Sequence, residues 1–282
     1  MKAPLRTVVE LVRAPAALSV PGDVIAGAAA AGTLGRGTAG LAGASVCFYW
    51  AGMAANDWAD RELDAVERPE RPIPSGRISA PAALGLAAGL TATGLALAAR
   101  AGGARALAVA VPLAAAVWAY DLRAKNTAAG PAGMALCRGL DVLLGATPGD
   151  PVRAVPAALV VAAHTYTVTE LSRREVAGSS TAALPAATLA ATAGLAGAVA
   201  ARGTPATAML AGEYLTSYGR AQARLFTDPA PSTVRGAVGA GITALPALQG
   251  ALTARAGRAW LGVAVAAAAP LGRLLARKVS PT

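Results

Sequence analysis

The chain has 282 residues, of which 55% are hydrophobic and only 14% are charged. Soluble globular domains carry about 25% charged residues, and disordered chains are poor in apolar ones, so the composition excludes both classes. The formal charge of +10 comes from basic residues that mostly stand singly between apolar stretches. This pattern is typical of membrane topology rather than of a nucleic-acid surface, so we expect membrane lipid as a partner and no nucleic acid.

Apolar stretches follow one another along the chain, and most have about the 17–25 residues that cross a bilayer. Only helices satisfy their own backbone hydrogen bonds in hydrocarbon without partner strands. We therefore predict an all-α polytopic membrane bundle of nine to ten transmembrane helices around a central cavity, in a single domain over residues 1–282. The stretches are 14–34, 38–55, 80–99, 104–120, 128–147, 154–169, 181–201, 205–222, 234–254 and 258–275.

The stretch 205–222 is interrupted by Glu213 and Arg220. It either spans the membrane or lies in the interface as an amphipathic segment. A count of nine or ten spans depends on this stretch and on the last one. We favour a core of nine helices with one extra helix at the C-terminal end.

Basic residues are concentrated in the N-terminus and in every second connection. Because such residues stay on the cytoplasmic side, the N-terminus and the loop after the second stretch are predicted to be cytoplasmic, in a multi-pass protein of the cell membrane. The residues are Lys2, Arg6 and Arg13 before the first stretch, Arg61, Arg68, Arg71 and Arg77 after the second, Arg123 and Lys125 after the fourth, and Arg173 and Arg174 after the sixth.

Six of the 15 acidic residues fall within residues 57–70, directly after the second stretch. On a helix, Asn56, Asp57, Asp60 and Asp64 share one arc over two turns, and Pro69 ends that helix at or before Arg68. Carboxylates crowded on one face repel one another unless cations lie among them, and Mg²⁺ suits oxygen ligands of this kind. The spacing favours a magnesium–phosphate site over a solvated acidic loop.

The string Asn56-Asp57-x-x-Asp60-x-x-x-Asp64 is followed by Arg68-Pro69-x-Arg71-Pro72-Ile73-Pro74-Ser75-Gly76. Together they resemble the first signature of the UbiA superfamily. Members are intramembrane prenyltransferases of about nine helices around a cavity open to lipid. The resemblance implies transfer of a prenyl group from a polyprenyl diphosphate to a small-molecule acceptor, with Mg²⁺ as cofactor.

Further matches extend over most of the chain. Tyr120-Asp121-Leu122-Arg123-Ala124-Lys125 is similar to a tyrosine-to-lysine step whose lysine contacts the diphosphate. The runs from Gly130-Pro131 to Arg138-Gly139 and Pro231-Ser232-Thr233-Val234-Arg235 resemble the branch of EboC-like proteins and digeranylgeranylglyceryl phosphate synthases.

The second signature of the superfamily is a carboxylate cluster after the sixth helix, and here the chain departs from it. Aligned on Gly178, the chain places Ser172 and Ser179 where carboxylates are expected, and it retains Glu175. Glu170 adds an off-register carboxylate, while Arg173 and Arg174 add positive charge. The second metal is then held by Glu175 and Glu170, or partly replaced by an arginine on the phosphate.

In prenyl transfer, an allylic C–O bond ionises into a carbocation and a highly charged diphosphate, whose charge Mg²⁺ neutralises. We assign catalytic roles to Asp57, Asp60, Asp64 and Lys125, which supply metal ligation and a preorganised donor. The predicted metal ligands are Asn56, Asp57, Asp60, Asp64, Glu170 and Glu175. The predicted diphosphate contacts are Arg71, Arg77, Tyr120, Lys125, Arg138, Arg173 and Arg174.

Other polar residues have two readings each. Arg138 and Asp141 lie one turn apart in the fifth stretch and form either a structural pair or a substrate contact. His164 is either a helix–helix hydrogen-bond partner or a catalytic base. Tyr120 either stabilises the cation through its ring or anchors the interface. Asp23 either lines the acceptor pocket or accompanies a kink after Pro21.

Three functions remain open at this point. The first is prenyl transfer, and the second is a terpene cyclase on the same scaffold, which traps the cation with the double bonds of the substrate. The third is a non-enzymatic lipid or metabolite carrier, which the altered second signature permits. The sequence gives no sign of an obligate protein partner.

Overall fold

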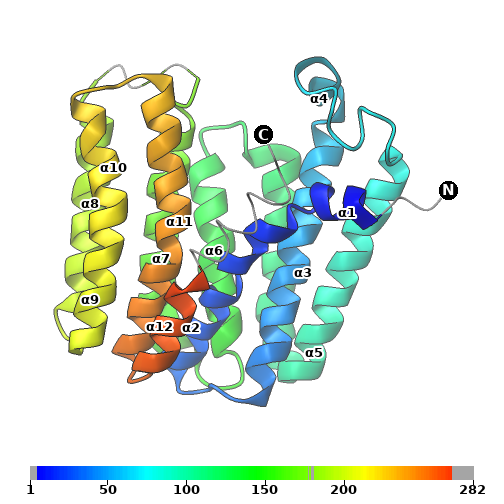
Figure 1. Cartoon of the computed structure of the whole chain (residues 1–282). Coiled ribbons are helices and arrows are strands. Elements are labelled where there is room, and N and C mark those ends of the chain that lie inside the picture. Colours follow the sequence, from blue (N-terminus) through cyan, green and yellow to red (C-terminus); the bar gives the residue numbers. More distant parts are fainter. Residues whose placement is uncertain (1–4, 177, 179–180, 269–282) are drawn as a thin grey trace.

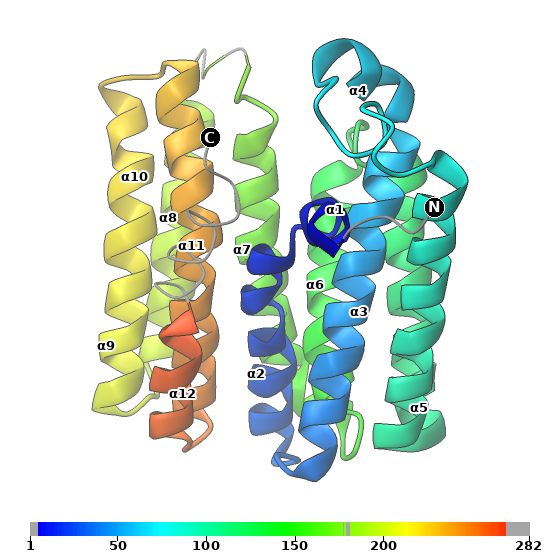
Figure 2. The same cartoon turned by 45° about the vertical axis from the view of Figure 1, so that its right-hand side comes forward.

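The computed structural model describes residues 5–176, 178 and 181–268, and the regular structure within these residues is entirely helical (Figure 1). Long helices stand side by side, and α1 (Leu5–Leu11) lies across their direction (Figure 2). The short helix α4 (Arg61–Glu67) and the loop after it project at one end of the bundle. The predicted all-α class is confirmed.

The N-terminal half of the bundle is built from α2, α3, α5 and α6. Gly103 (φ 64°) interrupts α5, and the indole nitrogen of Trp118 donates to the Thr91 hydroxyl at 3.1 Å, so the two arms fold back on each other as a hairpin. Glycine adopts this positive φ at little cost. The elements are η1 (Ala14–Ser19), α2 (Pro21–Ala31), α3 (Arg36–Ala59), α5 (Ala80–Ala119), η2 (Tyr120–Ala124) and α6 (Gly130–Ala146).

The C-terminal half packs α7, α8, α9, α10 and α11 around one apolar cluster that includes Tyr214 and Leu248. The segments α9, η4 and α10 form one rod that runs alongside α8 and α11 (Figure 1). The elements are η3 (Pro151–Ala154), α7 (Val155–Ser172), α8 (Ala183–Ala200), α9 (Pro205–Tyr214), η4 (Leu215–Gly219), α10 (Arg220–Ala223), η5 (Arg224–Phe226), α11 (Pro231–Arg255) and α12 (Ala259–Ala266).

The apolar stretches of the sequence coincide with these helices, and 258–275 extends beyond the described residues. Within the described part of the chain, four segments are long and apolar enough to span a membrane: Ala80–Ala124, Pro151–Ser172, Ala183–Ala200 and Pro231–Arg255. The chain is thus a multi-pass membrane protein. The stretch 205–222 stands upright beside its neighbours, because the residues that interrupt it, Glu213 and Arg220, are exposed on the outside of the rod.

Small residues let α2 and α6 cross in direct backbone contact. A Cβ atom on Gly27 would lie 1.8 Å from the carbonyl oxygen of Val142, and one on Gly145 would lie 2.0 Å from that of Val24. Any side chain at either glycine would force the helices apart. This crossing fixes the positions of Asp23 on α2 and Asp141 on α6, both of which are buried.

Candidate active site

A cavity of about 530 Å³ lies between η1, α3, α5, η2, α6, α7 and α11. Its walls are mainly apolar, with Phe48, Leu113, Val168, Ile242 and Leu245 among the lining side chains. Polar groups gather at two levels of the cavity. One level is near the end of α3 that carries the acidic residues, and the other is deeper in the bundle.

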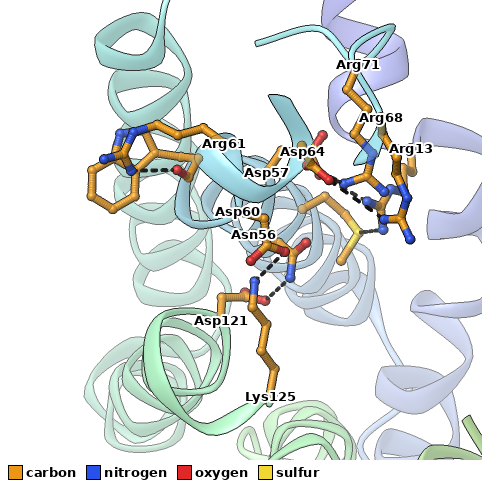
Figure 3. A network of polar contacts seen from close by, with 12 residues as sticks. Arg13, Asn56, Asp57, Asp60, Arg61, Asp64, Arg68, Arg71, Asp121 and Lys125 are labelled. Carbon is orange, nitrogen blue, oxygen red and sulfur yellow. Dashed lines mark hydrogen bonds and ion pairs between the residues drawn. The ribbon is translucent and has the colours of Figure 1, made fainter. Parts of the chain in front are cut away.

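The first level is built around α3, α4 and η2 (Figure 3). We call Asn56, Asp57, Asp60, Asp64 and Asp121 the carboxylate rim. Asp57 and Asp64 are nearly buried, and one guanidinium joins them: Nη1 of Arg71 lies 2.7 Å from Oδ2 of Asp64 and 3.3 Å from Oδ1 of Asp57. Arg13 adds a second contact to Asp57 at 3.0 Å, and Arg68 approaches Asp64 at 3.8 Å.

The other side of the rim faces η2. Nζ of Lys125 lies 2.7 Å from Oδ2 of Asp60, and the side-chain amide of Asn56 donates to Oδ1 of Asp121 at 3.2 Å. The four carboxyl groups of the rim therefore face four cations, namely Arg13, Arg68, Arg71 and Lys125 (Figure 3). Burial of so many carboxylates is tolerated because each has a charged or hydrogen-bonding partner.

The predicted single helical arc needs a correction at Asp60. Helix α3 ends at Ala59 and α4 begins at Arg61, with Asp60 at φ −87° and ψ 2° between them. Backbone bonds from Asp60 to Asn56 and from Asp64 to Asp60 still carry the helical register across this bend, and the four side chains lie in two sets, Asp57 with Asp64 on one side and Asn56 with Asp60 on the other (Figure 3). Within the described residues, no three His, Cys, Asp or Glu side chains converge closely enough to form a ready-made metal site.

None of the three aspartates of the motif is part of the cavity wall. Arg13, Tyr120 and Asp121 line the cavity. Asp57 is bound to Arg13 and Asn56 to Asp121, so both are one contact away from the cavity. The oxygen-rich donor set fits the ligand preference of Mg²⁺. The guanidinium groups presently occupy carboxylate oxygens that a metal would use.

The predicted pair of Glu170 and Glu175 is separated. Helix α7 ends at Ser172, and Glu175 lies in the turn beyond it, where it lines the cavity beside Ser172. Burial raises the pKa of the Glu175 carboxyl, and the nearby Arg235 opposes that rise. Glu170 is still on α7 and interacts with Tyr166 instead. Ser179 lies outside the described residues.

The predicted diphosphate contacts are also divided. Arg71, Tyr120 and Lys125 lie at or beside the rim. Arg77 is held elsewhere by Glu10, with nitrogen–oxygen distances of 2.5 and 2.8 Å. The remaining three lie away from the rim: Arg173 donates to the Thr127 carbonyl, Arg174 is exposed, and Arg138 lines the deeper part of the cavity.

The deeper level corrects the proposed pair of Arg138 and Asp141. Nε of Arg138 lies 2.9 Å from Oδ2 of Asp23, while Oδ1 of Asp23 accepts from the Gln249 amide at 2.6 Å. Asp141 instead accepts from the Ser45 hydroxyl at 2.5 Å. The close contact between α2 and α6 brings Asp23 into an ion pair with Arg138. Asp141, one turn from Arg138 on α6, forms no such pair.

His164 also lines the cavity, and its Nδ1 lies 3.0 Å from the Tyr214 hydroxyl. This is the helix–helix hydrogen bond that one reading of the sequence predicted. The ring stacks edge-on against Tyr214 and Tyr218.

Sequence reasoning missed two residues of the site, Arg13 and Asp121. The sequence indicates only a role of Arg13 in membrane orientation, because nothing in it brings Arg13 near residue 57. Asp121 stood inside the motif from Tyr120 to Lys125 without a role. A carboxylate one residue after Tyr120, in a motif otherwise basic, was the available signal.

Residues 19–216 match the sequence model of the UbiA prenyltransferase family. The chain belongs to the UbiA prenyltransferase family. It is accordingly a transferase-family membrane enzyme, and the family generally uses Mg²⁺. The resemblance read from the first signature is thereby confirmed.

Individual relatives match over shorter segments. The digeranylgeranylglyceryl phosphate synthase of Ignicoccus hospitalis is 44% identical over 90 residues, which are 32% of this chain and 30% of the relative. The bacteriochlorophyll synthase 33 kDa chain of Cereibacter sphaeroides is 53% identical over 58 residues, 21% of this chain and 18% of that protein. These alignments thus span less than a third of the length of either curated relative.

Two solved structures share the fold of this UbiA-family chain. One, described as digeranylgeranylglyceryl phosphate synthase in membranes, has a TM-score of 0.67 at 18% identity and covers 89% of this chain and 98% of that one. The other is an apo UbiA homolog from Aeropyrum pernix, with a TM-score of 0.66 at 21% identity and coverage of 84% and 96%. At these identities the likeness concerns the fold alone.

Proposed function

We propose that the protein transfers a prenyl group from a polyprenyl diphosphate to a small-molecule acceptor inside the membrane, with the carboxylate rim holding Mg²⁺ and the diphosphate. The observation that carries this proposal is the placement of the rim and its cations behind Arg13 and Asp121, directly at an apolar cavity of about 530 Å³.

Asn56, Asp57, Asp60 and Asp64 are the proposed metal ligands, and Asp121 is added to them because it accepts from Asn56. Bound there, Mg²⁺ would neutralise the negative charge of the leaving diphosphate. Arg71, Arg13 and Lys125 exchange partners on substrate binding: they leave the carboxylates and donate to phosphate oxygens, which are equally good acceptors.

The cavity walls are proposed to bind the prenyl chain and to stabilise its allylic cation. Tyr120 lines the cavity at the level of the rim, where its ring face can stabilise an allylic cation. Phe48, Leu113 and Val168 surround the prenyl chain, at about 0.8 kcal/mol for each buried methylene group, and keep water from the cation. Glu175 faces the same cavity and is the proposed carboxylate of the second site.

We further propose nine membrane-crossing helices, with the two arms of α5 counted separately and the rod from α9 to α10 counted as one. Helix α12 belongs to an additional C-terminal span. The N-terminus and α4 face the cytoplasm, because basic residues surround them. A reporter fused after Arg77 should read cytoplasmic, and a periplasmic reading would reverse this orientation.

Release of diphosphate tests the proposal. Purified protein in lipid nanodiscs is incubated with geranylgeranyl diphosphate or farnesyl diphosphate and Mg²⁺, with and without EDTA. We expect chelator-sensitive diphosphate release that Asp60→Asn abolishes and that Glu67→Gln, an exposed acid of the same segment, retains. Absence of release and of chelator-sensitive diphosphate binding would refute the proposal. Hydrocarbon or terpene alcohol products without an acceptor would indicate cyclisation instead.

A further inference from the structure

The deeper level of the cavity contains more carboxylates than cations. Arg138 is committed to Asp23, and its second nitrogen contact is the Ser19 carbonyl at 3.4 Å. Asp23 therefore has a charged partner at Oδ2, and Gln249 donates a hydrogen bond to its other oxygen, Oδ1. Asp141 accepts from the Ser45 hydroxyl on Oδ2 and forms no ion pair among the described residues, since Arg138, one turn away on α6, pairs with Asp23 instead.

Asp141 is only 4% exposed, and it lines the cavity together with Ser45. Its Oδ1 is buried without a hydrogen-bond partner among the described residues. A buried acceptor left unpaired is costly, so native structures normally supply a donor. The terminal torsion of aspartate is broad, and a modest rotation presents this oxygen to a cavity occupant.

The position of Asp141 fits the second substrate. Ser45, which binds Asp141, lies about 16 Å along α3 from Asn56, at about 1.5 Å of rise per residue. A diphosphate held at the rim places the reactive carbon partway along this distance. An acceptor of one or two rings then spans the remainder, with its nucleophile toward the rim and its far end at Asp141.

We propose that Asp141 is a specificity-determining residue that binds a hydroxyl or amino group at the far end of the acceptor and rejects an anionic one. A carboxylate or phosphate at this end would meet the unpaired oxygen of Asp141, while Arg138, the cation that lines the same part of the cavity, is already paired with Asp23. A hydrocarbon end would leave that oxygen unpaired. The proposal deepens the prenyl-transfer function proposed above and relies on it for the role of the ligand.

Three probes that differ only at one end of the ring test this proposal by calorimetry of detergent-solubilised protein. They are para-hydroxybenzyl alcohol, its benzylic methyl ether and para-hydroxybenzoate. We expect the wild type to prefer the alcohol to the other two by about tenfold, as sites that hydrogen-bond a substrate hydroxyl do. Asp141→Asn keeps an oxygen for Ser45 and should abolish the preference for the alcohol over the ether.

Thr165→Val is the matched control, because Thr165 lines the same cavity but its hydroxyl is used by the Val161 carbonyl. It should retain the preference. Should Asp141→Asn fail to fold, Ser45→Ala leaves the carboxyl in place and should retain the preference as well. The proposal is overturned if the wild type binds none of the probes, favours the benzoate, or shares its preference with a folded Asp141→Asn.

These titrations contain no prenyl diphosphate, so their outcome is independent of catalysis. Absent diphosphate release with intact probe selectivity would reject the proposed function and leave Asp141 as a donor-binding site. Normal diphosphate release without probe selectivity would support the proposed function and reject the role of Asp141 in acceptor binding.

Discussion

The two acidic segments of this UbiA-family protein differ in how their carboxylates are held. In the first, Asp57 and Asp64 share the guanidinium of Arg71, and Asp60 is paired with Lys125. In the second, Glu175 lines the cavity while Glu170 interacts with Tyr166 outside its lining. Spacing in the sequence is therefore a poor guide to convergence unless the backbone conformation is also known.

The difference has a physical cause. Helix α3 continues into α4 with only a bend at Asp60, and backbone bonds from Asp60 to Asn56 and from Asp64 to Asp60 keep the register. The second segment crosses the end of α7, so Glu170 and Glu175 lie in different backbone environments. An intact helical register brings carboxylates together, and a helix end separates them.

The largest expected effect is on the first segment. Asp64→Asn should lower kcat for diphosphate release by about 100-fold or more, because the rim loses a carboxylate ligand of the Mg²⁺ that would neutralise the leaving diphosphate. Glu67→Gln, also on α4 but exposed, should leave kcat unchanged. Equal losses in both variants would show that net charge, and not the geometry of the rim, determines activity.

The next largest effect is expected from removal of Arg71, the cation that Asp57 and Asp64 share. Arg71→Gln should lower the free energy of unfolding in EDTA by about 1–3 kcal/mol, because two nearly buried carboxylates lose a donor. Mg²⁺ should restore more stability in this variant than in wild type, as measured by thermal melting in detergent. The exposed Arg174 of the second segment provides the control Arg174→Gln, and a similar loss there would contradict the proposed role of Arg71.

Within the second segment, the structure distinguishes two glutamates that the sequence could not. Glu175→Gln should lower kcat/KM about tenfold, the scale of a supporting group at a metal site. Glu170→Gln should leave kcat/KM at its wild-type value in the same diphosphate-release assay. A larger loss at Glu170 would mean that the catalytic arrangement differs from the described one.

The smallest effect is expected at the ion pair between Glu10 on α1 and Arg77 in the loop after α4. A hydrogen bond from Arg77 holds the pKa of Glu10 below its ordinary value of 4.5. A lowered pKa stabilises the fold above the unfolded pKa, and this stabilisation is lost as pH falls below 4.5 through the folded pKa. Melting curves between neutral pH and that range should show a small loss that Glu10→Gln removes and that salt diminishes.

The helices were predictable because apolar runs of bilayer length leave the backbone few alternatives. Even the interruption of α5 was visible, since two apolar stretches flank Gly103. The bend at Asp60 was not visible, because the residues around it favour a helix on both sides. The partners of Arg13 and Arg138 were not predictable, because Asp57 and Asp23 lie 44 and 115 residues away from them in the sequence.

The sequence by itself determined the membrane class and the family, and it grouped four of the five side chains of the rim, namely Asn56, Asp57, Asp60 and Asp64. Each depends on local composition or on residues a few positions apart. Only the tertiary structure decided which cation neutralises which carboxylate and which carboxylate lacks one. Those outcomes depend on helix crossings such as that of Gly27 and Gly145, where backbone contact between distant segments sets the distances between charges.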